Sequence, residues 1–218
     1  MAVSALYKGA ALMGGVGSIV GGYFLANNLS SNQKPEKKVT SIEDRLRQEG
    51  YTPLNFKDTT GNDWNKIKTA YKAENTDNKR FTGIDKNNEN TLLKEISDSC
   101  VQYLKGDFNN EDNYKMSRRW CVVPISVQSK LQGRTFLKTE TGDSSDDTHW
   151  DKIVKQHESG QNDKFTITTG SGDSTNNRDE IKKQCKEKSA FETTHADFEE
   201  ALKKVDLWCT KESIKEGQ

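Results

Sequence analysis

The sequence predicts a mostly α-helical protein: an N-terminal single transmembrane helix, then two tandem small helical repeats of about four short helices each, with long polar loops. Three observations lead to this prediction. The chain opens with an uncharged apolar run, its later landmarks recur after about 85 residues, and apolar side chains return with helical spacing in each copy. The expected divisions are an anchor or signal segment (1–26), a linker (27–40), repeat 1 (41–124), repeat 2 (125–210) and a tail (211–218).

Composition limits the kinds of partner and core that the chain can have. Basic and acidic residues balance at 33 each, which leaves no electrostatic footprint for nucleic acid, so no nucleic-acid partner is expected. Hydrophobic residues make up only 31% of the chain, and many of them lie in its first part. The remainder cannot fill a large core, which favours small packing units held by cross-links.

The N-terminal segment predicts a membrane anchor. Gly9–Ala26 contains no charged residue and just reaches the length needed to cross the hydrocarbon core. We prefer an uncleaved single-pass anchor, so that the membrane is the first expected partner. Two alternatives stay open: a cleaved signal peptide, for which Lys8 gives a weak basic region, and a buried helix of a soluble domain.

Small residues recur at every fourth position of this span. They are Ala10, Gly14, Ser18, Gly22 and Ala26. On a helix this spacing gives one smooth face that lets another helix approach closely, as in membrane helix pairs. A structural membrane protein that self-associates through this transmembrane packing face is therefore the alternative function.

Two signals disagree about which side of the membrane the soluble part occupies. Lys34, Lys37 and Lys38 follow the span and favour an inside C-terminus. The cysteines described below favour an oxidising exterior. We expect a single-pass protein of the cell membrane with its soluble part extracellular.

The repeat is the most specific pattern in the sequence, because six landmarks recur in the same order with offsets of 84 to 88 residues. The first copy carries Ser41-Ile42, Asp63-Trp64-Asn65-Lys66-Ile67, Phe81-Thr82, Glu95-Ile96, Cys100 and Trp120-Cys121. The second carries Ser126-Val127, His149-Trp150-Asp151-Lys152-Ile153, Phe165-Thr166, Glu180-Ile181, Cys185 and Trp208-Cys209.

Each copy is expected to open with a short helix followed by an extended or irregular piece. These helices lie near Ser41–Glu49, where Gly50 is a natural C-terminal stop, and near Ser126–Leu131. Brief extended pieces are expected at Tyr51–Phe56 and Lys164–Thr168.

The second helix of each copy is expected to carry the first tryptophan. In the first copy Asn62 or Asp63 is the candidate cap. The apolar faces are Trp64, Ile67, Ala70 and Tyr71 in the first copy and Trp150, Ile153, Val154 and His157 in the second. Polar connectors follow at Asn75–Asn88 and Ser159–Asn177, and we expect mobile loops there.

The third and fourth helices are expected to carry the cysteines. Their apolar faces are Leu92, Leu93, Ile96, Cys100, Tyr103 and Leu104; Tyr114, Ser117, Trp120 and Cys121; and Phe198, Ala201, Leu202, Val205, Trp208 and Cys209. The tryptophans recur at matching places, which suits core packing better than stacking on a ligand.

The cysteine spacing predicts disulfides within each copy. The simplest pairing is Cys100 with Cys121 and Cys185 with Cys209, although four cysteines allow three connectivities. Each bond would stabilise its unit by roughly 3 kcal/mol. Three alternatives stay open: reduced cysteines buried as small hydrophobes, a zinc site, for which no close cysteine pair exists, and catalytic Cys–His chemistry.

The histidines do not recur between the copies, so they predict no shared site. His157 replaces Tyr71 on a helix face and is expected to be a half-buried packing residue. His149 is expected at a helix start and His195 at the solvated opening of the last helix.

Two loops resemble known sites only in part. Asp143, Asp146 and Asp147 form an acidic cluster without the glycine and closing glutamate of a calcium loop, so charges of a solvated loop or of a helix start are expected. The 170–172 loop lacks the lysine of a phosphate cradle. We expect no catalytic residue, cofactor, metal or small-molecule substrate, and the prediction is that the protein is not an enzyme.

The segments RLRQEGYTPLN (45–55), DWNKI (63–67) and RWCVVP (119–124), together with the Gly- and Ala-rich N-terminus, resemble a paralogous family of membrane and surface proteins in hemotropic mycoplasmas. These are wall-less bacteria attached to blood cells. The resemblance covers nearly the whole chain, but the family is defined by similarity rather than by chemistry, so it transfers no catalytic residue. It implies surface exposure, with antigenic variation or host-surface contact as the expected role.

Overall fold

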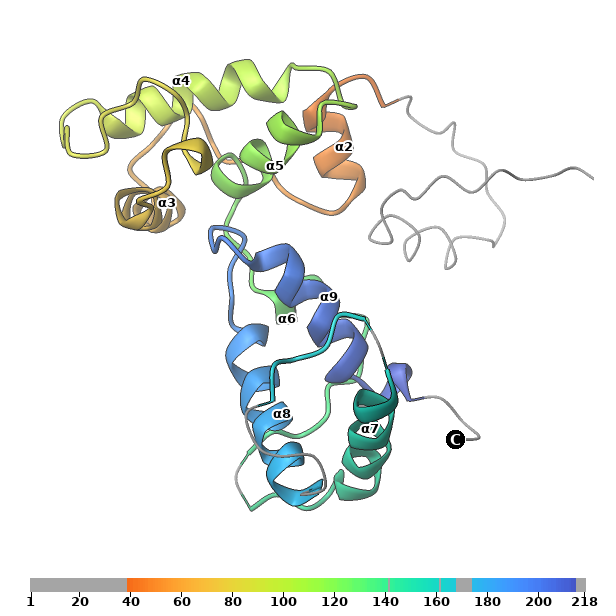
Figure 1. The fold of residues 1–218 in the computed structure, drawn as a ribbon. Coiled ribbons are helices and arrows are strands. Elements are labelled where there is room, and N and C mark those ends of the chain that lie inside the picture. The colour runs from red at the N-terminus through yellow and green to blue at the C-terminus, as the bar shows by residue number, and fades with distance from the viewer. Residues whose placement is uncertain (1–38, 141, 161, 168–173, 215–218) are drawn as a thin grey trace, which may run out of the picture. The chain divides into compact units, whose positions relative to one another are not determined.

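The prediction of a mostly α-helical protein is confirmed. A computed structural model describes residues 39–140, 142–160, 162–167 and 174–214 (Figure 1). The predicted anchor at 1–26, its small-residue face and nearly all of the linker lie outside the described residues. Within the described ranges, none of the helices combines the length and the apolar character needed to cross a membrane. Contacts place all described residues in one compact unit, Lys37–Gln218.

The described residues form eight α-helices, four in each half of the chain. The first half (39–124) contains α2 (Ile42–Gln48), α3 (Asn62–Ala73), the short helix η1 (Asp77–Lys79), α4 (Leu92–Leu104) and α5 (Glu111–Trp120). The second half (125–214) contains α6 (Val127–Lys130), α7 (Asp147–Ser159), α8 (Ser174–Ser189), α9 (Phe198–Trp208) and η2 (Lys211–Ser213). In each half the helix that contains the first cysteine packs on the helix that the second cysteine follows, α4 on α5 and α8 on α9.

The starts of the first helices follow from serine caps. The Ser41 side chain accepts the backbone N–H of Asp44 at the start of α2, and Ser126 accepts that of Ser129 at the start of α6. Gly50 has a φ of 81° directly after α2, a conformation that glycine adopts without steric cost.

The predicted cap of α3 was wrong. Neither Asn62 nor Asp63 caps the helix, because both already lie in its first turn. Gly61 is the N-cap residue, and its carbonyl accepts the backbone N–H of Asn65. The helix therefore begins one residue earlier than the side-chain pattern indicated.

The long connectors contain more structure than a loop. The 75–88 segment includes η1 and places Phe81 in the core, with 3% of its surface exposed. The predicted 159–177 loop is partly wrong, because α8 already begins at Ser174. An extended piece was predicted at Tyr51–Phe56, and this segment forms a single antiparallel bridge, between Pro53 and Val122.

The same long-range backbone contacts occur in both halves. The N–H of Ile42 donates to the carbonyl of Gly106, and 85 residues later Val127 donates to Phe191. Leu54 donates to the carbonyl of Cys121, and Leu137 to that of Cys209, so the residue after the last helix is fixed in the same way in each half.

Candidate functional site

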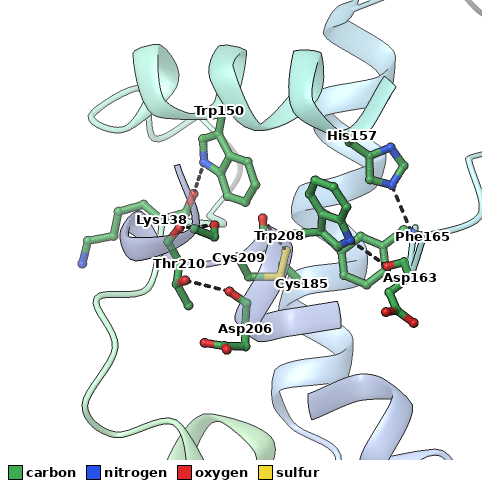
Figure 2. Close-up of a disulfide and its surroundings, with 11 residues drawn as sticks. Lys138, Trp150, His157, Asp163, Phe165, Cys185, Asp206, Trp208, Cys209 and Thr210 are labelled. Atoms are coloured by element: carbon green, nitrogen blue, oxygen red, sulfur yellow. Dashed lines mark hydrogen bonds between the residues drawn. A yellow bond between two sulfur atoms is a disulfide. The ribbon is translucent and has the colours of Figure 1, made fainter. Parts of the chain in front are cut away.

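The core of each half is built around a cysteine pair at disulfide distance. The Cα atoms of Cys100 and Cys121 are 5.4 Å apart, and those of Cys185 and Cys209 are 5.7 Å apart. Each of these four cysteines has at most 1% of its surface exposed. Of the three possible connectivities, the structure has the one that the spacing favoured (Figure 2).

All four tryptophans are buried in the core, as predicted, and each binds a connecting segment to it. Every indole N–H donates to a backbone carbonyl in a non-helical segment or a short 3-10 helix. The pairs are Trp64 with Asn55 and Trp120 with Lys79 in the first half, and Trp150 with Lys138 and Trp208 with Asp163 in the second. Figure 2 shows the two pairs of the second half. The indoles therefore position the connectors between the helices as well as filling the core.

His157 is a buried acceptor beside the second disulfide (Figure 2). It is 3% exposed, more buried than predicted, and its Nε2 accepts the backbone N–H of Phe165 at 3.0 Å. Its ring meets that of Trp208 edge-on, with centroids 4.9 Å apart. Burial, assisted by the charge of Lys164, lowers the pKa of His157 to about 4, so the imidazole is neutral and its acceptor nitrogen is occupied.

We expect the stability of the protein to fall by up to about 3 kcal/mol as the pH drops from about 7 to about 4. The unfolded chain binds a proton at His157 below its ordinary pKa of 6.5, whereas the folded chain does so only near pH 4. The contribution of neutral His157 to the stability is therefore fully present above pH 6.5 and is lost as the pH falls toward 4. Urea titrations at a series of pH values measure this, and His157→Tyr, the residue found at the equivalent Tyr71, should flatten the profile. An unchanged profile in that variant would show that another group is responsible.

Asp146 and Asp147 lie at the start of α7, as the helix-start alternative predicted, but Asp146 is buried. Its carboxylate is buried, accepts the backbone N–H of Lys138 at 2.9 Å and pairs with Lys211 at 2.9 Å. Burial would raise the pKa of Asp146, but the bond from Lys211 and the one from the Lys138 backbone outweigh it and lower the pKa. Asp147 instead pairs with Lys182 and Arg178 on α8. The carboxylates of Asp146 and Asp147 therefore join the start of α7 to other segments of the second half.

The remaining sequence candidates lie at the surface or outside the described part. His195 is exposed, as predicted, although α9 begins only at Phe198. His149 lies in the first turn of α7, 3.5 Å from Asp146. The 170–172 glycine loop lies outside the described residues. Among the residues that the structure does describe, no three His, Cys, Asp or Glu side chains converge as a metal site would require.

An aromatic and charged cluster joins the two halves. Arg118 on α5 is only 8% exposed and pairs with Glu199 on α9 at 2.5 Å. Its guanidinium lies 5.8 Å from the ring centroid of Tyr114 and 5.9 Å from that of Phe198. Arg118 is therefore held between one ring from each half.

Lys130 adds a second contact across the same junction. Its ammonium donates to the carbonyl of Glu49 at the end of α2 and lies 3.9 Å from the ring centroid of Tyr51. Burial lowers the pKa of Lys130, while the nearby charge of Glu49 opposes this change. The carboxylate of Glu49 accepts the hydroxyl of Tyr114, which links the lysine to the ring beneath Arg118.

A groove of about 720 Å³ follows this junction along α3 and the 190–196 segment. Small side chains form its walls, among them Ala70, Ala73, Ala190 and Ala196. Arg119 lines it and donates to the carbonyl of Thr194 at 2.9 Å and to the carboxylate of Glu74 at 2.6 Å. Burial would raise the pKa of Glu74, but the hydrogen bonds from Thr76 and Arg119 outweigh it and hold the pKa at about 2.

Two contacts at or beside this groove join the halves. Arg119 donates to the carbonyl of Thr194, and Lys66 on α3 pairs with Glu192 at 2.5 Å, whereas the pair of Arg119 and Glu74 lies within the first half. Sequence reasoning missed this junction. The sequence contains one signal for it, a difference between matching positions of the two copies. Arg118-Arg119 precede Trp120 in the first copy, whereas Asp206-Leu207 precede Trp208 in the second.

No family model matches the chain, and no curated protein or solved structure matches it significantly.

Proposed function

We propose that the chain is a membrane-anchored cell-surface protein, displayed as an antigen or adhesin and not acting as an enzyme. The observation that carries this proposal is the placement of all four cysteines in two buried pairs at disulfide distance. Disulfides form and persist in oxidising compartments, and a cytoplasmic location would leave these thiols reduced. The uncharged span before the linker supplies the anchor, and the resemblance to mycoplasma surface proteins points the same way.

We further propose that the displayed part consists of two copies of one helical unit. Support comes from the matching element order, from the backbone contacts that recur 85 residues apart, and from the equivalent cysteine and tryptophan positions. Such a unit needs its disulfide for stability, because few apolar residues are available to each core. The surface around Asn75, at the rim of the groove, is the proposed region of host contact.

The sharpest test treats intact cells with trypsin and follows residues 27–218 by mass spectrometry, with lysed cells as the matched control. We expect this segment to be cleaved from the outside, and its cysteines to react with a maleimide only after unfolding and reduction. Protection until lysis, together with thiols that react after unfolding alone, would place the segment in the cytoplasm. The signal of Lys34, Lys37 and Lys38 would then be the correct one, and the surface proposal would be withdrawn.

A second test separates display from binding. The purified full chain in detergent is applied to host cells, with the chain reduced and alkylated under denaturing conditions as the control. Binding that is lost after reduction supports an adhesin that depends on the stapled fold. Surface exposure without binding leaves the antigen role and removes the adhesin role.

A further inference from the structure

The two halves use equivalent surfaces differently. In the first half, α3 and the end of α5 form a docking face that contains Lys66 and Arg119. The 190–196 docking segment of the second half lies on this face through the pair of Lys66 and Glu192 and the bond from Arg119 to the carbonyl of Thr194. The contact between the halves is thus a face meeting a segment, a head-to-tail arrangement.

The second half carries the equivalent face on α7 and α9, with different chemistry. Lys152 stands where the first half has Lys66, and it is exposed. Leu207 stands where the first half has Arg119, and 38% of its surface is exposed. Among the residues that the structure describes, Leu207 is the only large hydrophobic side chain with this exposure. The face therefore combines an exposed cation with an exposed apolar side chain, whereas the outer face of a terminal repeat is typically polar throughout.

The first half carries the equivalent docking segment at 105–110, between α4 and α5. Its backbone is held as in the second half, since Gly106 and Phe191 accept the equivalent N–H bonds. Asp107 occupies the position of Glu192 and is exposed, and the half-buried Phe108 follows it. The segment thus offers an acidic group for Lys152 and an aromatic ring for Leu207.

We propose that another molecule of this chain docks its 105–110 segment onto the α7–α9 face, head to tail. Lys152 pairs with Asp107 of the second molecule as Lys66 pairs with Glu192 within the chain. Leu207 packs on Phe108, an apolar contact that replaces the bond from Arg119. In each molecule the α7–α9 face and the 105–110 segment take no part in the contact between the halves, so this heterologous contact builds an open array or, where the rotation closes, a ring. A shared membrane would raise the effective concentration of a weak contact of this kind.

This inference concerns the described part and does not rest on the side of the membrane. It also differs from self-association through the small-residue face of the anchor, because it predicts which two surfaces meet.

Cysteine cross-linking of the full chain in membranes tests the contact. Two differently tagged variants, Lys152→Cys and Asp107→Cys, are expressed singly, together, and as one double variant, and are analysed by non-reducing electrophoresis after mild oxidation. Both positions are exposed, and Asp107→Cys removes only the bonds that Asp107 accepts from Asn109 in the same loop, so we expect both variants to fold. We expect a dimer only when the two variants are mixed, and a ladder of dimers, trimers and longer species from the double variant.

Leu207→Arg, added to Lys152→Cys, is the matched disruption. Leu207 is exposed, so this substitution leaves the fold intact, and we expect it to lower the cross-linked yield about tenfold. Three results would overturn the proposal: no cross-link in the mixture, equal cross-linking of either single variant with itself, or a yield that Leu207→Arg does not change. The second result is the one expected from association through the anchor alone.

Discussion

Replacing Cys185 and Cys209 together by alanine is expected to lower the free energy of unfolding by at least about 3 kcal/mol. The bond closes a loop with a sequence separation of 24 residues and restricts the unfolded chain. It also holds α8, a helix whose apolar residues are only Ile181 and Cys185. Without the staple, α8 has little buried apolar surface to keep it on α9, so its loss should exceed the value from loop closure alone.

The matched control is the double alanine variant of Cys100 and Cys121, with a separation of 21 residues. Its loop is similar, but α4 also buries Leu92, Ile96 and Leu104, which hold the helix independently. Urea denaturation followed by circular dichroism gives both losses, and hydrogen exchange shows whether the α8 amides open first. If both variants lost the same free energy of unfolding, α8 would not depend on its disulfide more than α4 does. Losses below about 1 kcal/mol in both would show that neither cysteine pair stabilises the fold as a disulfide.

The parts of the fold that could be predicted from sequence are those in which one side chain has few alternatives. Two cysteines on neighbouring helices must meet if they are to be bonded, and the recurrence at Cys100 and Cys185 selected one pairing from three. The tryptophans were predictable as core because a large ring in a chain this poor in apolar residues has nowhere else to pack. The apolar faces of the helices could be predicted for the same reason, because few apolar residues are available to form them.

The junction could not be predicted, because charge pairs carry no pattern in a chain with 33 basic and 33 acidic residues. Arg118 pairs with Glu199, 81 residues later in the chain, and Lys130 donates to the backbone carbonyl of Glu49, 81 residues earlier. Nothing near these residues in the sequence distinguishes them from solvated charges. The burial of Asp146 could not be predicted for the same reason, since only the fold brings the Lys138 backbone and Lys211 to it. The role of His157 depended on where the Phe165 N–H would point, which a helix pattern does not encode.

Trp120→Ala is expected to lower the free energy of unfolding by about 4 kcal/mol. The side chain is fully buried, and its ring meets that of Tyr71 edge-on with centroids 4.9 Å apart. Its N–H donates to the carbonyl of Lys79 at 2.9 Å, and Arg119 lies 4.4 Å from its ring centroid. The substitution therefore opens a cavity, frees the 75–88 connector and loosens the residue that links the halves.

Trp120→Phe separates these contributions, because phenylalanine keeps most of the ring but not the N–H. We expect it to cost about 1–2 kcal/mol, since the Lys79 carbonyl loses its donor and the smaller ring leaves part of the space empty. Urea denaturation measures both variants, and hydrogen exchange in 75–88 measures the connector. If the alanine variant lost no more stability than the phenylalanine variant, the indole would be serving as a tether and not as the centre of the core. A loss confined to the first half would likewise show that the two halves unfold independently, because a junction built on Arg118 and Arg119 should transmit the damage to the second half.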